Sequence, residues 1–212
     1  MRHPRRHRIR RILKGVIPRT CLLYVALGLG CRMVSAQQVQ VTLDPVETQI
    51  NISVHDVHGG VHGSFKLKSG SVLFDRTTGA ASGEIVVDAI SGVTGNDTRD
   101  RKMKQEVLES QHYPEIVFAP ARVIGRVAAQ GSSNVQVQGT FRIHGGSHEI
   151  TLTVPVQISG DKLTATTNFV VPYQSWGMKN PSVLFLRVDG KAEISITATG
   201  HISLVNGGNG VH

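Results

Sequence analysis

Residues 91–118 read SGVTGNDTRDRKMKQEVLESQHYPEIVF, and this is the one stretch beyond the first forty residues with a clear helical pattern. Asn96 or Thr98 is placed to cap a helix, and Pro114 marks its end. Almost everywhere else apolar and polar residues alternate with period two, which is typical of strands with one buried face. The sequence therefore predicts a β-sheet with one helical segment, residues 96–110, that caps an opening.

Short turns join about eight alternating segments in up-and-down order. The clearest is residues 150–158, and residues 184–188 are expected to form a strand near the end of the chain. Ser69-Gly70, Gly145-Gly146 and Asp189-Gly190 are typical of turns between strands. Antiparallel strands in this order hide their edges by closing into a barrel, and eight strands leave room for one small ligand. We therefore expect an all-β antiparallel barrel of about eight strands, with a two-layer sandwich around a solid core as the alternative.

The positive charge of the chain is concentrated at its N-terminus. The formal net charge is +8, but residues 1–36 hold nine of the 23 basic residues and no acidic residue. The remainder has 14 basic and 15 acidic residues, so no basic stripe is left to neutralise phosphates. This distribution argues against nucleic acid as a partner of the folded part.

The same N-terminal segment has the three parts of a secretory signal peptide. A basic start precedes an apolar run over residues 21–29 and the small-residue site Val34-Ser35-Ala36. The run is shorter than the roughly 20 apolar residues that a membrane helix needs. We expect cleavage after Ala36 and a periplasmic or secreted protein with no membrane span, with a retained anchor or a lipid on Cys31 as alternatives. Because both cysteines, Cys21 and Cys31, lie in this leader, the mature chain would use no disulfide or thiol chemistry.

Residues 37–204 are expected to form one domain, followed by a flexible tail over residues 205–212. The domain has few aromatic residues: six Phe, two Tyr and Trp176. Its predicted inward faces carry mostly Val, Ile, Leu and small residues, which leaves space for a long apolar guest. The alternative is that these side chains interdigitate and fill the interior, as in many β cores.

A series of short motifs lies between residues 49 and 200. In order they are Val61-His62-Gly63-Ser64-Phe65, Ser69-Gly70 with Phe74-Asp75, Ser91-Gly92 with Gly95-Asn96, Arg99-Asp100, Met103, Tyr113-Pro114-Glu115-Ile116 with Phe118, and Gly139-Thr140-Phe141 before Gly145. In this order and spacing they resemble the YceI-like family of exported lipid-binding proteins. The resemblance implies a lipocalin-like barrel with a helical segment across one end and a long cavity for polyisoprenoid or similar amphiphilic lipids. Ile50-x-Ile52 departs from the Phe-x-Val that many members carry in the first strand.

The expected ligand is therefore an isoprenoid-like or other amphiphilic lipid, bound by a monomer or homodimer that has no catalytic reaction and no cofactor. The sequence contains no G-x-S-x-G and no H-E-x-x-H motif. Contacts to the lipid head group are expected from Arg99, Asn96, Tyr173 and His58. The apolar lining is expected to comprise Phe65, Leu67, Phe74, Ile85, Val87, Met103, Val107, Phe118, Phe141, Phe169, Trp176 and Leu186.

Two other functions remain open. His55, His58 and His62 form the pattern H-x2-H-x3-H. Imidazoles suit zinc or copper if three or four of their nitrogens converge, so one alternative is a small metal-dependent enzyme. The simpler interpretation places them, with His144 and His148, as polar residues of the barrel rim. The second alternative is an envelope interaction protein with a filled core.

Two polar features also allow more than one role. Arg99 and Asp100 are placed either to form an ion pair that ties the cap to the barrel rim or, for Arg99, to bind a phosphate in a bidentate manner. Tyr173 and Trp176, in the loop between Pro172 and Pro181, either plug the barrel or line the ligand tunnel.

Overall fold

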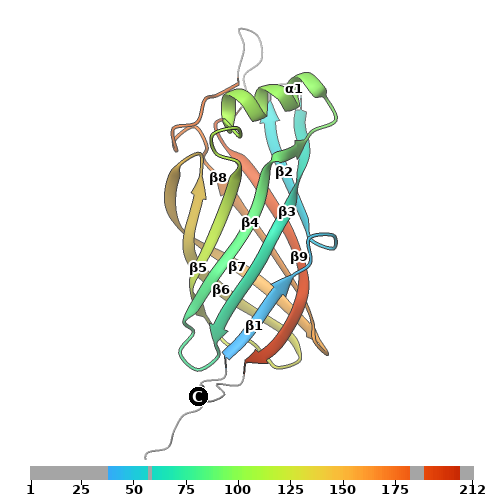
Figure 1. Ribbon diagram of the computed structural model, residues 1–212, viewed down its shortest axis with the longest axis vertical. Coiled ribbons are helices and arrows are strands. Elements are labelled where there is room, and N and C mark those ends of the chain that lie inside the picture. The colour runs from blue at the N-terminus through green and yellow to red at the C-terminus, as the bar shows by residue number, and fades with distance from the viewer. Residues whose placement is uncertain (1–37, 57–58, 182–188, 206–212) are drawn as a thin grey trace, which may run out of the picture. The chain divides into compact units, whose positions relative to one another are not determined.

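The computed structural model describes residues 38–56, 59–181 and 189–205 of the 212-residue chain. In this part, strands dominate and two short helical turns follow one another between the fourth and fifth strands (Figure 1). The strands are β1 (Gln38–Leu43), β2 (Gln49–Asp56), β3 (Gly59–Asp75), β4 (Ala81–Val93), β5 (Glu115–Ile124), β6 (Gly131–Ile143), β7 (Gly146–Ser159), β8 (Lys162–Val171) and β9 (Ala192–Val205). The helical turns are the α-helix α1 (Asp97–Lys102) and the π-helix η1 (Met103–Val107).

The strands form one closed antiparallel barrel. From β3 to β9 each strand pairs with the next along the chain, and β1 and β2 close the ring between β3 and β9. These two strands share one place in the barrel: Val39 of β1 pairs with Phe74 and Leu204, whereas Ile50 of β2 pairs with Phe65 and Ile196. The barrel is therefore eight strands around, although the described chain forms nine. This confirms the predicted all-β barrel with its helical cap and rejects the sandwich.

The β6–β7 hairpin shows how tightly the turns are specified. Ile143 pairs directly with Gly146, which leaves His144 and Gly145 as a two-residue loop with φ of 51° and 74°. Two successive positive φ angles characterise the type I′ turn, whose twist matches that of the flanking strands. The hairpin predicted here is confirmed, with its corner one residue earlier than Gly145-Gly146.

The turn predicted at Ser69-Gly70 is wrong, because β3 runs through this position without reversing direction. The pairing with β4 only shifts register between Leu67 and Ser69. A side chain at Gly70 would clash with the neighbouring strand, because a Cβ there would lie 2.7–2.9 Å from three side-chain atoms of Leu43 in β1. The glycine therefore makes room for the neighbouring strand rather than for a turn.

The cap begins at the predicted residue. The Asn96 side chain accepts a hydrogen bond from the Arg99 backbone N–H at 3.0 Å, which satisfies one of the free donors at the helix start. The α-helical hydrogen bonds then give way to π-type bonds, such as that from Leu108 N–H to Met103 O at 2.9 Å. The cap thus lies within the predicted segment 96–110, but it is a short α-helix followed by a π-turn that ends at Val107.

The interior of the barrel has two different halves. At the end where β1 begins, here called the packed end, buried apolar side chains meet across the barrel. At the end covered by α1 and η1, the capped end, a second cluster surrounds open space. The packed cluster comprises Val39, Val41, Leu43, Ile50, Leu67, Phe74, Val135, Val156, Ile158 and Leu163.

Several sequence predictions lie outside the described residues. They are the leader over residues 1–36, His58, the strand predicted over residues 184–188 with Leu186, and the tail beyond Val205. None of the helices in the described ranges has the length and apolar character needed to cross a bilayer.

Candidate functional site

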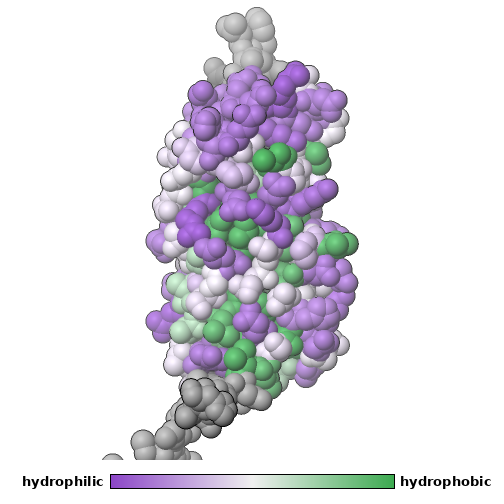
Figure 2. Space-filling view, viewed as in Figure 1, coloured by the Kyte–Doolittle hydropathy of each residue, from purple (hydrophilic) through white to green (hydrophobic). Residues whose placement is uncertain are grey.

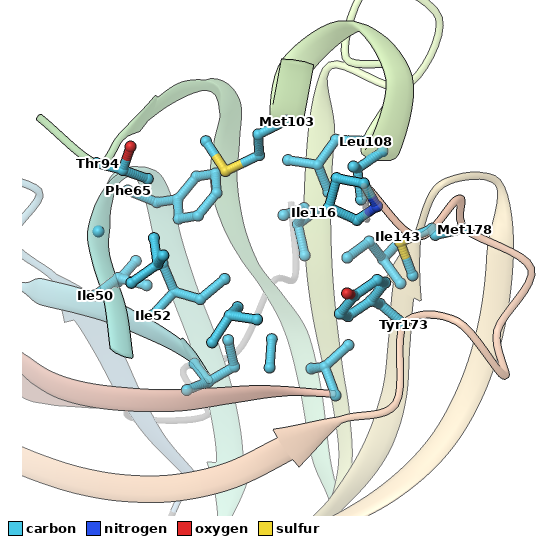
Figure 3. Close-up of a pocket in the computed structure, with 18 of the residues that line it drawn as sticks. Ile50, Ile52, Phe65, Thr94, Met103, Leu108, Ile116, Ile143, Tyr173 and Met178 are labelled. Atoms are coloured by element: carbon cyan, nitrogen blue, oxygen red, sulfur yellow. The ribbon is translucent and has the colours of Figure 1, made fainter. Parts of the chain in front are cut away.

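The capped end of the barrel encloses a cavity of about 460 Å³. This volume lies within the range of about 300–1,000 Å³ that is usual for small-molecule sites. Figure 3 shows Ile50 and Ile52 facing it from one side and Ile143 and Tyr173 from the other, with Met103 of the cap above them.

Apolar residues from most strands form the wall of the cavity. The inward positions of β2, β3, β8 and β9 supply one part of the wall, and the cap and the segment after β8 supply the rest. The apolar wall comprises Ile50, Ile52, Val54, Val61, Gly63, Phe65, Val87, Met103, Val107, Leu108, Ile116, Phe141, Ile143, Phe169, Val171, Met178, Pro181, Ala192, Ile194 and Ile196.

Polar side chains enter the wall mainly where the chain passes from β4 into the cap. Apart from Tyr173, the polar lining residues are Thr94, Asn96, Thr98, Arg99 and Lys102. Two of these five are cations, and none of the described residues that line the cavity is acidic. One edge of an otherwise apolar cavity therefore carries positive charge.

Thr94 is hydrogen-bonded to both Asp100 and Arg99 at this polar edge. Its hydroxyl and its backbone N–H both donate to Asp100 Oδ1, at 2.5 and 2.8 Å. In return, Arg99 donates from Nε to the Thr94 hydroxyl at 2.7 Å and from Nη2 to the Thr94 carbonyl at 2.9 Å. The salt bridges among the described residues do not include the predicted Arg99–Asp100 ion pair, because both side chains bind Thr94 between them.

The second cation of the edge links the cap to the segment that follows β8. Lys102 Nζ donates to the carbonyl oxygen of Pro181 at 3.0 Å. The same segment contributes Tyr173, whose hydroxyl donates to the Asp189 carbonyl oxygen. Burial of the phenol, together with the nearby Asp189 carboxylate, raises the pKa of Tyr173 above its ordinary value of 10.0.

The structure brings together many of the residues predicted to hold a ligand. Arg99, Asn96 and Tyr173, expected at the head group, all lie in the cavity wall. Half of the predicted apolar lining lies there too, namely Phe65, Val87, Met103, Val107, Phe141 and Phe169.

Five of the predicted lining residues lie elsewhere. Leu67 and Phe74 are buried in the packed cluster, and Ile85 packs against it. Phe118 and Trp176 pack against the cluster of the capped end but are not among the residues that line the cavity. The four strand residues occupy inward positions as predicted, but the alternation of a strand gives no information about height along the barrel axis.

Trp176 is not among the residues that line the cavity. Its indole stacks on the His148 ring, with centroids 3.8 Å apart and planes 7° apart, and it also contacts Phe141 at 5.9 Å. Tyr173, in contrast, lines the cavity directly. The two aromatic residues of this loop therefore have different positions relative to the cavity.

The histidines do not converge where the structure describes them. His62 Nδ1 is 2.7 Å from Ser53 Oγ on the outer face, and His144 Nε2 is 3.5 Å from Glu109 Oε1 at the end of the cap. His148 faces the interior against Trp176. No three His, Cys, Asp or Glu side chains of the described ranges are grouped as metal ligands, and His58 is outside those ranges.

Lys102, Thr94 and Leu108 are wall residues that the sequence reasoning missed. A helical projection of the segment would have placed Lys102 beside Arg99, three residues away on the same face. Leu108 reaches the cavity after the π-turn, which no simple helical period predicts.

Comparison with known proteins agrees with this architecture. The family model of the YceI-like domain matches residues 41–200. No curated protein is detectably similar in sequence.

Solved structures are similar in fold at low sequence identity. A polyisoprenoid binding domain from Saccharophagus degradans, implicated in plant cell wall breakdown, has a TM-score of 0.62 and 16% identity over 77% of this chain and 98% of that one. BcnA of Burkholderia cenocepacia has a TM-score of 0.60 and 17% identity over 74% and 98%. The YCEI protein of Campylobacter jejuni has a TM-score of 0.51 and 18% identity over 68% and 85%. Since the family model spans most of the chain and these barrels share its fold, the protein belongs to the YceI-like domain family.

Proposed function

We propose that this protein is an exported lipid-binding protein that holds an isoprenoid-like amphiphile in the cavity of its capped end. The observation that carries the proposal is the cavity itself: about 460 Å³, apolar on nearly all sides, with the cations Arg99 and Lys102 along one edge. The similarity in fold to a polyisoprenoid binding domain supports the same ligand class.

The mechanism would be partition of an apolar tail into the cavity. Burial contributes roughly 25 cal/mol for each Å² of apolar surface, so a long tail supplies most of the affinity and little chemical selectivity. The wall of Ile, Val, Leu and Phe offers the tail no hydrogen-bonding partner, which disfavours a tail with polar groups.

The head group would lie at the polar edge beside Arg99, Asn96 and Lys102. Arg99 already donates from Nε and Nη2 to Thr94, so its remaining N–H groups would bind the ligand while Thr94 fixes the orientation of the guanidinium. With Lys102 alongside, this edge favours a phosphate or carboxylate head over a neutral alcohol.

A ligand test needs a probe and a variant that fills the cavity. Dansylundecanoic acid is suitable, because energy transfer from Trp176, the only tryptophan in the chain, reports binding close to the cavity. Ile52 and Ile194 pair directly across β2 and β9 and both line the cavity. In the double variant Ile52→Phe/Ile194→Phe the larger rings should weaken probe binding at least about tenfold, because excluding ~55 Å² of apolar probe surface costs ~1.4 kcal/mol.

The control is Val170→Phe, which adds a ring to a residue 51% exposed on the outer face of β8. Its affinity for the probe should equal that of the wild type. Equal affinity of the cavity double variant and the wild type would refute binding in this cavity.

Two measurements on protein purified from its own host address ligand class and export. Native mass spectrometry should reveal a retained lipid mass, and the intact mass of the chain should correspond to a start at Gln37. A bare full-length chain would contradict both parts of the proposal.

A further inference from the structure

The barrel wall has a local break between β3 and β4, near the cap. Ser64 pairs with Val93 and Lys66 pairs with Asp88, so the single residue Phe65 lies opposite residues 89–92. The break is bridged by a side chain: Ser91 Oγ donates to the Asp88 carbonyl at 2.6 Å and accepts from the Lys66 N–H at 2.8 Å. At this point β4 bulges away from its partner strand.

The outer side of the bulge presents apolar side chains. Ile90 is 51% exposed and Val93 is 49% exposed, although the outer faces of these strands are otherwise largely polar. Figure 2 shows apolar groups among hydrophilic ones just beneath the hydrophilic capped end. Ile90 and Val93 line a shallow depression, here called the bulge surface, formed by Ser64, Lys66, Asp88, Ile90, Ser91, Val93 and Lys104.

The bulge surface and the cavity lie on opposite sides of the same thin wall. Gly63, next to Ser64, lines the cavity. A Cβ on Gly92 would lie 2.6 Å from both Met103 Cε and Phe65 Cε1, so these cavity-lining side chains rest directly on the β4 backbone. One backbone layer therefore separates the apolar depression outside from the apolar cavity inside.

The charge of the bulge surface is positive. Lys66 comes from β3 and Lys104 from η1, and within the described ranges neither ammonium group has a carboxylate within ion-pair distance. Asp88 is the only acid among the residues that form the depression, and its Oδ1 accepts a hydrogen bond from the Ile90 N–H at 2.8 Å. The surface thus joins two exposed aliphatic side chains to two lysines that form no ion pair within the described part of the chain.

We propose that the bulge surface docks the protein on an anionic lipid bilayer. Ile90 and Val93 would enter the interfacial region, while Lys66 and Lys104 contact anionic head groups; this combination of apolar burial and basic charge binds proteins peripherally to membranes. The inference rests on the proposed function for its purpose, since docking here would bring the cavity wall against the source of the lipid. If the bulge surface instead bound a protein partner, binding would not need anionic lipid. Dependence on anionic lipid therefore distinguishes a bilayer from a protein as the occupant.

The test is flotation of the purified mature chain with vesicles of phosphatidylcholine containing phosphatidylglycerol, compared with phosphatidylcholine alone. The wild type should float with the anionic vesicles only. Lys66→Gln/Lys104→Gln should weaken binding by about 25-fold, at about fivefold for each lysine, and Ile90→Ser/Val93→Ser should weaken it on the order of tenfold.

Matched controls lie on the far side and at the other end of the barrel. Val170, with the same 51% exposure as Ile90, is on β8, four places from β4 around the eight-place ring in either direction. Val170→Ser should float as the wild type does. So should Arg126→Gln/Lys162→Gln, which removes the same charge but also breaks the ion pair between Lys162 Nζ and Glu47 Oε2 at 2.6 Å. Absence of vesicle binding by the wild type, or equal losses in the bulge and control variants, would overturn the docking proposal.

Dansylundecanoic acid in free solution separates this proposal from the proposed function. The bulge variants should bind the probe as the wild type does while losing vesicle binding. If the wild type floats but does not bind the probe, docking stands and the cavity function fails; if it binds the probe but does not float, the reverse holds.

Discussion

The two halves of this barrel share most of their strands and one alternating pattern, yet one half is solid and the other hollow. At the packed end, Val39 is 1% exposed and Ile158 is 2% exposed, and side chains from opposite strands meet. At the capped end, where β2 takes the place of β1, the wall surrounds a cavity of about 460 Å³ (Figure 3). Alternation therefore decides which residues face inward, and other features decide whether the interior is filled.

One difference is the strand that completes the ring in each half, which is β1 at the packed end and β2 at the capped end. At the packed end β1 directs Val39, Val41 and Leu43 inward, and Leu43 lies against Gly70, where no side chain competes for the space. At the capped end the large side chains lie along the wall instead of crossing the interior. Phe65 and Met103 rest on Gly92, and Phe141 packs edge-on against Phe169 with ring centroids 5.8 Å apart.

The largest effect is expected from the same truncation, Phe to Ala, made once in the packed half and once in the hollow half. Phe74→Ala at the packed end should lower the free energy of unfolding by about 3–5 kcal/mol, since it leaves a void among buried neighbours. Phe169→Ala at the cavity wall should cost about half as much, because one side of its ring already lacks packing atoms. Urea unfolding of both variants measures the two losses, and equal losses would contradict a solid half and a hollow half.

A smaller effect is expected from the polar contacts that hold the cap. Thr94→Val removes the hydroxyl that Arg99 and Asp100 share, and Asp100 is only 9% exposed, so its carboxylate loses a buried partner. We expect a loss of about 1–3 kcal/mol. Hydrogen exchange should accelerate in α1 and η1 and remain unchanged in the core of the packed end, whereas uniform acceleration would show that the two halves unfold together.

The barrel was predictable because its evidence is local and repeated. Period-two alternation, short turns and the cap residue Asn96 each specify an element, and together they favour an antiparallel barrel with one helical segment. The sandwich is excluded only by the pairing of β1 and β2 with β3 and β9. It was not predictable that β1 and β2 occupy the same position in the ring, since nothing in the sequence of either strand indicates that it spans only part of the barrel.

The candidate site was predictable only in part for the same physical reason. Phe74 and Phe169 both occupy inward positions, but pairing register places the first at the packed end and the second beside the cavity. Register depends on residues far apart in the sequence, such as Phe169 with Ile194. Arg99 and Asp100 were correctly placed at the cap, but their common partner Thr94 is evident only from side-chain geometry.

The smallest expected effect concerns Tyr173, which joins the cavity wall to the segment after β8. Its folded pKa is raised above that of the unfolded chain, so the folded state binds the phenolic proton more tightly. The sign follows from linkage: this contribution to stability is complete below pH 10 and is lost as the pH rises through the folded pKa. Urea unfolding between pH 8 and pH 11.5 should therefore show a decline that is smaller in Tyr173→Phe, where no proton can be lost at this site. Tyr113 is 37% exposed, so Tyr113→Phe is the control and should retain the wild-type decline. An identical alkaline decline in Tyr173→Phe and the wild type would show that this phenol is no less hydrated in the folded chain than in the unfolded one, and the cavity wall would then be open to water on that side.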